Sequence, residues 1–200
     1  MKKMCLVLVF LVFASWVYAV DFKILGGINL SRSTEPLAGH WIEEYSATTQ
    51  YGAGVLFGAG VEFYLSQSVA LEVDGFYFQK GSRLELRYWD EVVGHSIDRM
   101  NELSFPVLLK IYLRPGTSPY LLGGGEFAFV LANQSDPYNY GFVSQRTEYG
   151  LVFGAGLRKQ INRAYISVEG RYNHGLQDMR SDFSMLRKMR VFSLIVGVSF

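Results

Sequence analysis

The sequence is poor in cysteine, in proline and in net charge. Its 200 residues include 1 Cys and 5 Pro, and its 19 basic and 18 acidic residues leave a formal charge of +1. Because Cys5 lies close to the N-terminus, the rest of the chain can hold no disulfide, no thiolate metal site and no cysteine nucleophile. The balanced charge gives no electrostatic reason to expect nucleic acid as a partner.

Long apolar runs are also missing. After residue 19 no run approaches the roughly 18 residues of a membrane helix, which excludes a helical membrane protein. The apolar stretch 4–13 is too short to span a bilayer, but it follows two lysines and precedes Val17-Tyr18-Ala19, which resembles a cleavage site. We therefore expect residues 1–19 to be a cleavable signal peptide, with an uncleaved anchor as the alternative, and residues 20–200 to form one domain.

The sequence is rich in aromatic residues and glycine, and its apolar residues recur at every second position. With 13 Tyr, 15 Phe and 21 Gly, the composition favours strands and tight turns over helices. From Tyr51 to Leu65, the odd positions are apolar or aromatic and the even positions are mostly glycine. The same period of two recurs in eight segments and predicts eight strands. These segments are residues 22–31, 51–65, 71–77, 103–113, 126–131, 149–158, 166–172 and 192–200.

The connections between these segments alternate in length. The long, polar connections are residues 32–50, 79–101, 132–147 and 176–189, and the short ones are residues 66–68, 115–119 and 160–163. Long loops on one side and tight turns on the other are typical of outer-membrane barrels. The fold class we predict is therefore all-β, an eight-stranded antiparallel up-and-down transmembrane β-barrel. Both termini then lie on the short-turn side, in the periplasm.

The composition of the two strand faces favours a barrel in lipid over a soluble one. One face carries large apolar side chains, whereas the other mixes glycine with charged residues. A soluble lipocalin-like barrel, the alternative for a ligand-binding protein, would pack its large apolar side chains inside. A membrane barrel reverses this arrangement, so that lipid covers the apolar face and the charges face the lumen.

Nine charged residues fall on the face that we assign to the lumen. They are Lys23, Glu62, Glu72, Asp74, Lys110, Glu126, Arg158, Glu169 and Arg171. An eight-stranded barrel is just wide enough to be filled by its own side chains. Because an unpaired buried charge costs several kcal/mol, we expect these residues to pair in a sealed lumen. A small pore or transport-related barrel is the alternative.

The sequence offers little catalytic chemistry. None of its three histidines has metal-ligand spacing, so we expect no metal, no cofactor and no enzymatic activity. One enzymatic alternative is a lipid-modifying barrel in which His174 acts with Ser181 or Ser184. Only Asp178 or Asp182 could orient that histidine.

We expect the function to lie in the long connections. Leu84, Leu86 and Tyr88 continue the alternation inside the connection 79–101, so this hairpin is expected to extend past the membrane. An extended hairpin can offer an edge to an unknown partner. We expect the protein to be a monomer with a structural or surface-interaction role.

Five segments, taken in order, resemble the PorT-like outer-membrane β-barrel family. They are GGINLS at 26–31, LSFPVLLKIYL at 103–113, PYLLGGGE at 119–126, RYNHGLQDM at 171–179 and FSLIVGVSF at 192–200. His174 departs from this pattern, because an aromatic residue is more usual there. The resemblance covers the whole mature chain and implies an outer-membrane location and a barrel fold, but no shared reaction.

The C-terminal strand carries one further expected signal. Apolar residues occupy alternate positions before the terminal Phe200, which resembles the strand signal read by the bacterial barrel-assembly machinery. This machinery and the outer-membrane lipid are therefore the partners that we expect.

Overall fold

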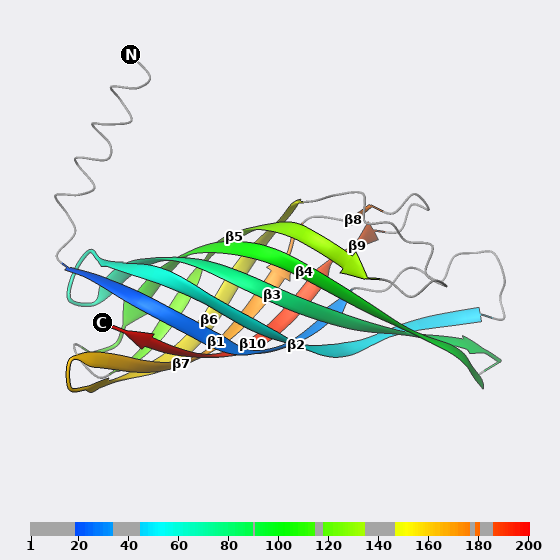
Figure 1. The fold of residues 1–200 in the computed structure, drawn as a ribbon, viewed down its shortest axis with the longest axis horizontal. Coiled ribbons are helices and arrows are strands. Elements are labelled where there is room, and N and C mark those ends of the chain that lie inside the picture. Colours follow the sequence, from blue (N-terminus) through cyan, green and yellow to red (C-terminus); the bar gives the residue numbers. More distant parts are fainter. Residues whose placement is uncertain are drawn as a thin grey trace, which may run out of the picture.

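The strands of the chain close into one antiparallel barrel (Figure 1). The computed structural model describes residues 19–33, 45–89, 91–114, 118–134, 147–176, 179–180 and 186–200. The barrel strands are β1 (Ala19–Ser33), β2 (Tyr45–Tyr64), β3 (Val69–Tyr88), β4 (Glu91–Tyr112), β5 (Ser118–Gln134), β6 (Thr147–Ile161), β7 (Ala164–Gly175) and β10 (Met189–Ser199). Their order around the wall is β1-β10-β7-β6-β5-β4-β3-β2, which confirms the predicted eight-stranded fold.

Two short strands lie outside this wall. The short strands β8 (Met179–Arg180) and β9 (Leu186–Arg187) pair with each other within the connection 176–189, which was expected to be a loop. The residues that the structure describes include no helix long and apolar enough to cross a membrane. The predicted signal peptide lies outside the described residues, apart from Ala19.

Pairing of the first and last strands closes the barrel. β1 and β10 are in register from Lys23 opposite Ser199 to Ser33 opposite Met189. The backbones of Phe22 and Phe200 exchange two further hydrogen bonds, of 3.0 and 3.1 Å. Closure leaves no unpaired strand edge within the barrel wall. The start of β1 and Phe200 therefore lie at the same end (Figure 1).

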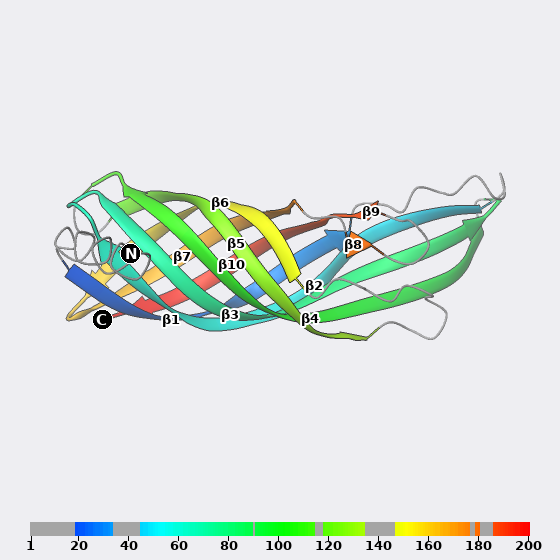
Figure 2. The same ribbon diagram turned by 90° about the horizontal axis from the view of Figure 1, so that it is seen from above.

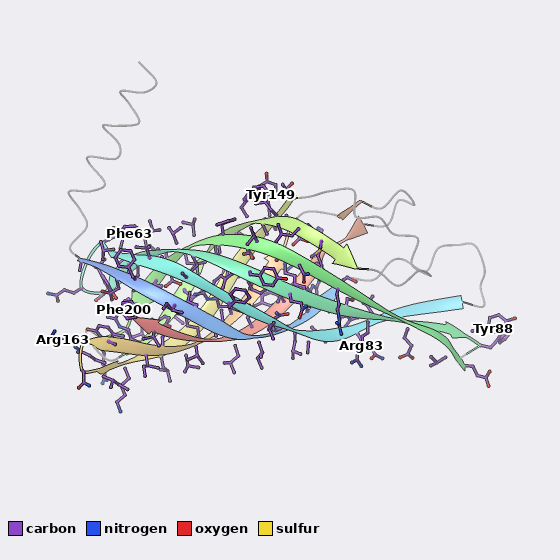
Figure 3. All side chains as sticks on the ribbon, in the orientation of Figure 1. Phe63, Arg83, Tyr88, Tyr149, Arg163 and Phe200 are labelled. Atoms are coloured by element: carbon purple, nitrogen blue, oxygen red, sulfur yellow. The ribbon has the colours of Figure 1, made fainter. Side chains whose placement is uncertain are left out.

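The side chains of each strand alternate between an exposed outer face and a buried inner face. In β1, Phe22 and Ile24 are 60% and 61% exposed, whereas Lys23 between them is 3% exposed. Figure 3 shows side chains standing out from the wall along the barrel, with Phe63 and Phe200 near one end and Tyr88 at the other. Apolar side chains such as Phe22 and Ile24 thus lie outside, whereas the lumen accommodates charged side chains such as Lys23.

Three strands continue well beyond their neighbours, and this corrects the predicted connections 32–50 and 79–101. β1 pairs with β2 only as far as Gly52, and β5 pairs with β4 only as far as Arg99. Past these points residues 45–51, 82–88 and 91–98 form a three-stranded hairpin extension, which Figures 1 and 2 show reaching away from the barrel. The expected extension of the hairpin over Leu84, Leu86 and Tyr88 is confirmed. The bounds of the two connections were wrong, because backbone pairing continues through the polar residues that follow the apolar part of each strand.

Candidate functional site in the barrel lumen

Seven of the nine predicted lumen residues meet in one cluster, which we call the central network. It consists of Lys23, Glu62, Glu72, Asp74, Lys110, Glu169 and Arg171, all of them buried. The cations come from β1, β4 and β7, whereas the carboxylates come from β2, β3 and β7. Strands on opposite sides of the barrel are thereby joined through its interior. Closure of the barrel is what brings residues so distant in sequence together.

Arg171 is held by carboxylates from two strands. Its Nη2 lies 2.6 Å from Glu72 Oε1 and 2.5 Å from Glu169 Oε2, and its Nη1 donates to Asp74 Oδ2 at 2.9 Å. Charge-assisted hydrogen bonds of this kind are about twice as strong as neutral ones. The planar guanidinium therefore fixes the positions of three carboxylates at once.

The two lysines of the central network share the same acids. Lys110 Nζ lies 2.6 Å from Glu72 Oε2 and 2.9 Å from Glu169 Oε1, and Lys23 Nζ contacts both residues as well. Glu62 completes the set, at 3.7 Å from Lys23 and 3.6 Å from Lys110. Each cation thus contacts three carboxylates, and such pairing offsets the cost of burying its charge.

Arg158 lies apart from these residues, at the end of the lumen nearest Phe200, in a group we call the Arg158 cap. Its guanidinium stands over the rings of Tyr112, Tyr165 and Tyr64, with its Cζ 4.0, 4.6 and 5.4 Å from their centroids. It also donates hydrogen bonds to the Tyr64 and Tyr112 hydroxyls. The Tyr112 hydroxyl in turn donates to Glu62, which links the cap to the central network.

An apolar layer follows the central network along the lumen. It is made of Leu25, Leu56, Phe76, Phe78, Val191 and Ile195, all buried. On the inner face of β3, Phe76 and Phe78 come directly after Glu72 and Asp74. A cation faces each of them, because Arg171 Cζ is 5.5 Å from the Phe76 ring and Lys80 Nζ is 5.7 Å from the Phe78 ring.

Beyond the apolar layer lies a second ion-pair group, the Lys80 cluster, which sequence reasoning missed. Lys80 pairs with Glu102 and lies 3.2 Å from Glu148. Glu126, the remaining one of the nine predicted lumen residues, lies near this group. It accepts hydrogen bonds from Ser104 and, at 2.5 Å, from Asn173. Lys80 was missed because position 80 was assigned to a connection. Continuing the alternation of β3 past Gln79 would have found it.

Glycines in the wall make room for these inner side chains. A Cβ on Gly156 would lie 2.4 Å from the ring of Tyr120, whose hydroxyl donates to Glu169 at 2.7 Å. A Cβ on Gly60 would lie 1.9 Å from Asp74 Oδ1. The glycine-rich face is therefore the counterpart of the bulky lumen residues that the neighbouring strands contribute.

Of the residues named for the enzymatic alternative, His174 alone lies in the part of the chain that the structure describes. His174 lies on the outer wall, with its Nδ1 3.3 Å from the Tyr172 hydroxyl. Ser181, Ser184, Asp178 and Asp182 lie outside the described residues. No group of His, Cys, Asp or Glu among the described residues could hold a metal ion.

Comparisons with known proteins agree with this geometry. A family model described as an outer membrane protein beta-barrel domain matches residues 18–181. OprG of Pseudomonas aeruginosa has 18% sequence identity and a TM-score of 0.58, with 90% of this chain and 95% of OprG covered. At that identity the likeness concerns the fold alone.

Two further barrels are more distant. Ail of Yersinia pestis has 14% identity and a TM-score of 0.44, covering 90% of this chain and 98% of Ail. Outer membrane protein W of E. coli has 15% identity and a TM-score of 0.44, covering 91% and 98%. No curated protein sequence matches the chain. The narrower resemblance to the PorT-like family stays a prediction.

Proposed function

Because the chain belongs to the family of outer membrane protein β-barrel domains, which implies the bacterial outer membrane, we propose that it is a non-enzymatic integral barrel with a sealed lumen. Its working surface is the hairpin extension, which faces the cell exterior, while the barrel end that carries Phe200 faces the periplasm. Residues 1–19 serve as the export signal. A small pore is the competing function.

The filling of the lumen along β3 is the observation that carries this proposal. Inner positions from Glu72 to Lys80 pass from the central network through the apolar layer to the Lys80 cluster. The cavity lined by Lys80, Glu126, Glu148 and Asn173 measures about 10 Å³. Such a volume holds about one water molecule, so the packing favours a plug over a channel.

The outer face of the barrel supports the membrane location. Alternate residues from Phe22 to Leu30 on β1 and from Phe192 to Phe200 on β10 face outward, and nearly all of them are large and apolar. We call this zone the apolar belt. Nine residues of a tilted strand are about what a bilayer requires.

Electrical recording of the refolded full chain in planar bilayers tests the seal. We expect no large, stable conductance, because each barrier in the lumen consists of packed or paired side chains. A gel comparing unheated with boiled samples confirms folding, since a folded barrel migrates differently after boiling. Sustained openings of a folded wild-type sample would replace the sealed barrel with the pore alternative.

Introduced cysteines test the orientation and the signal peptide together. Trp89→Cys, at the tip of the hairpin extension, should react with a membrane-impermeant maleimide on intact cells. Arg163→Cys, in the turn between β6 and β7, should react only after lysis (Figure 3). The unmodified chain is the control, because removal of residues 1–19 takes away its single Cys5. Labelling of the unmodified chain after denaturation would indicate an uncleaved anchor.

A surface-interaction role has its own supporting observation. At the tip of the hairpin extension Tyr88, Trp89 and Val92 are 36%, 70% and 45% exposed, and Trp89 has a φ of 48°. Exposed aromatic residues are enriched at protein interfaces. Replacing Trp89 and Val92 by Ser should abolish any cell-surface interaction without changing the gel shift of the folded barrel. Retention of binding by that variant would move the interaction elsewhere.

A further inference from the structure

The outer wall contains a groove within the apolar belt. Its volume is about 530 Å³, and outward side chains of β1, β6, β7 and β10 line it. These are Ile28, Leu30, Phe153, Tyr172, Phe192 and Leu194. Gly170, opposite Leu194 on β10 and Ala155 on β6, leaves the groove open because it has no side chain. A Cβ placed there would meet only the Ala155 carbonyl oxygen, at 4.0 Å.

A row of basic side chains borders this groove. Strand register places Arg190 between Arg32 on β1 and His174 on β7. These three residues share the outward face, because each stands two positions along its strand from an outward residue that lines the groove. The row is therefore directly above Leu30, Phe192 and Tyr172, the uppermost residues of the groove.

Neighbouring aromatic residues position two of these three side chains. Arg32 Cζ lies 5.9 Å from the centroid of the Tyr51 ring, and its Nε donates to Thr49 Oγ1 at 3.3 Å. His174 Nδ1 lies 3.3 Å from the Tyr172 hydroxyl. Arginine at such a level keeps its stem against apolar surface and its head at the polar boundary. The row therefore stands where lipid headgroups begin.

We infer that this wall binds a phosphorylated lipid of the outer leaflet. One acyl chain occupies the groove at Gly170, and Arg32, Arg190 and His174 hold the phosphate. Hydrocarbon is the medium that surrounds the belt, so an acyl chain is the natural filling of an apolar groove there. Guanidinium groups match phosphate oxygens in geometry as well as in charge. The inference rests on the proposed location and orientation, which bring the row to the outer leaflet.

Lipid titration of the full chain, purified in detergent and followed by native mass spectrometry, tests the headgroup contact. The probe is diphosphoryl lipid A, compared with phosphate-free lipid A and with inorganic phosphate. We expect one tightly bound diphosphoryl lipid, and Arg32→Gln with Arg190→Gln should weaken its affinity about tenfold or more, because hydrogen bonds to charged groups are lost. Arg83→Gln, exposed at the base of the hairpin extension, is the matched charge control and should leave the affinity unchanged.

A second pair of variants tests the groove without touching any charge. Gly170→Leu fills the groove and should weaken lipid binding about tenfold. Gly26→Leu is the control. Position 26 also faces outward in the belt, a Cβ there would meet only the Leu56 carbonyl oxygen at 4.0 Å, and it does not line the groove. We expect Gly26→Leu to bind the lipid as the wild type does. Equal weakening by both leucines would overturn the groove assignment.

Two other outcomes would overturn the site. One is equal binding of phosphate-free lipid A or of inorganic phosphate alone, and the other is wild-type affinity in the double arginine variant. Boiled and unheated gels show whether each variant is folded, and Arg190→Gln alone replaces the double variant if that one fails to fold. If the wild-type barrel is folded and does not conduct but fails the lipid-binding test, the lipid site is wrong and the proposed function still holds. A conducting or soluble wild-type protein would remove the proposed function itself.

Discussion

The central network and the Lys80 cluster occupy the same lumen but differ in how their charges are compensated. Three cations meet four carboxylates in the central network, and Arg171 alone contacts three of them. In the Lys80 cluster one cation contacts Glu102 and Glu148, whereas Glu126 relies on the neutral donors Ser104 and Asn173. The first group is interlocked across the barrel, and the second depends on a single side chain. This difference predicts different responses to the loss of one charge.

The largest effect is expected from Arg171→Met. This substitution leaves Glu72, Asp74 and Glu169 without their shared guanidinium, in a region with no access to water. Breaking a buried pair by removing one partner costs about 3–5 kcal/mol, and we expect the free energy of unfolding to fall by that amount. Urea unfolding of the barrel in lipid vesicles measures it. A loss below about 1 kcal/mol would mean that the lysines compensate alone.

Lys80→Met should cost less, about 2 kcal/mol, which is within the cost of leaving a buried polar group unsatisfied. Glu148 is partly exposed, with 13% of its side chain accessible, so it can reach water when its cation is lost. Glu102 is fully buried and carries most of the penalty. The same urea experiment compares the two methionine variants directly. An equal loss in both would remove the distinction between the two groups.

Adding Glu102→Met to Lys80→Met should restore part of the lost stability. Replacing a buried ion pair with apolar side chains of similar volume is often neutral, because the desolvation cost disappears with the charges. We therefore expect the double variant to be more stable than Lys80→Met alone. A double-mutant cycle with both single variants measures the coupling, which for contacting residues is about 0.5–3 kcal/mol. Strict additivity would show that Glu102 does not depend on Lys80.

The same contrast explains what the sequence could predict. Lys23, Glu72, Asp74, Glu169 and Arg171 stand on strands whose alternate outer positions are apolar except for one glycine in each strand. One period of two therefore assigns both faces. The alternation does not specify which strands face each other across a closed lumen. The pairing of Arg171 with Asp74 follows from closure and register, and no local pattern contains that information.

The Lys80 cluster shows where the pattern stops being informative. Position 80 lies in the polar stretch 79–83, which separates the apolar part of β3 from the alternation that resumes at Leu84. This stretch looks like the start of a connection, although backbone pairing continues to Tyr88. The groove at Gly170 was also beyond reach, because a glycine on the outer face of a strand gives no sign of which neighbours surround the space it leaves. Apolar outer positions predict the belt, but only the register of four strands defines a groove within it.

Packing around the central network should affect stability about as much as Lys80→Met does. Gly156→Ala places a Cβ 2.4 Å from the Tyr120 ring, so the ring must move away from its hydrogen bond to Glu169. We expect a loss of about 2 kcal/mol, which is typical of an overpacked site, measured by urea unfolding. Gly125→Ala is the matched control, because its Cβ meets only the Gly150 carbonyl oxygen at 4.0 Å. If both alanines were tolerated, Tyr120 would have a second acceptable position and the network would be less rigid than its contacts indicate.

The smallest effect is expected at the Arg158 cap, where the faces of tyrosine rings contact the guanidinium. Arg158→Lys keeps the charge but loses the flat guanidinium, whose Cζ stands 4.0 Å from the Tyr112 centroid and 4.6 Å from that of Tyr165. A lysine ammonium cannot stack in this way, and cation–π contacts at partly exposed sites contribute about 1 kcal/mol. We expect a loss of that size by urea unfolding, with Arg163→Lys in the exposed turn as the unchanged control. If Arg158→Lys were neutral and Arg158→Met were not, charge would matter at the cap and stacking would not, and the cap would then resemble the Lys80 cluster in depending on one positive charge.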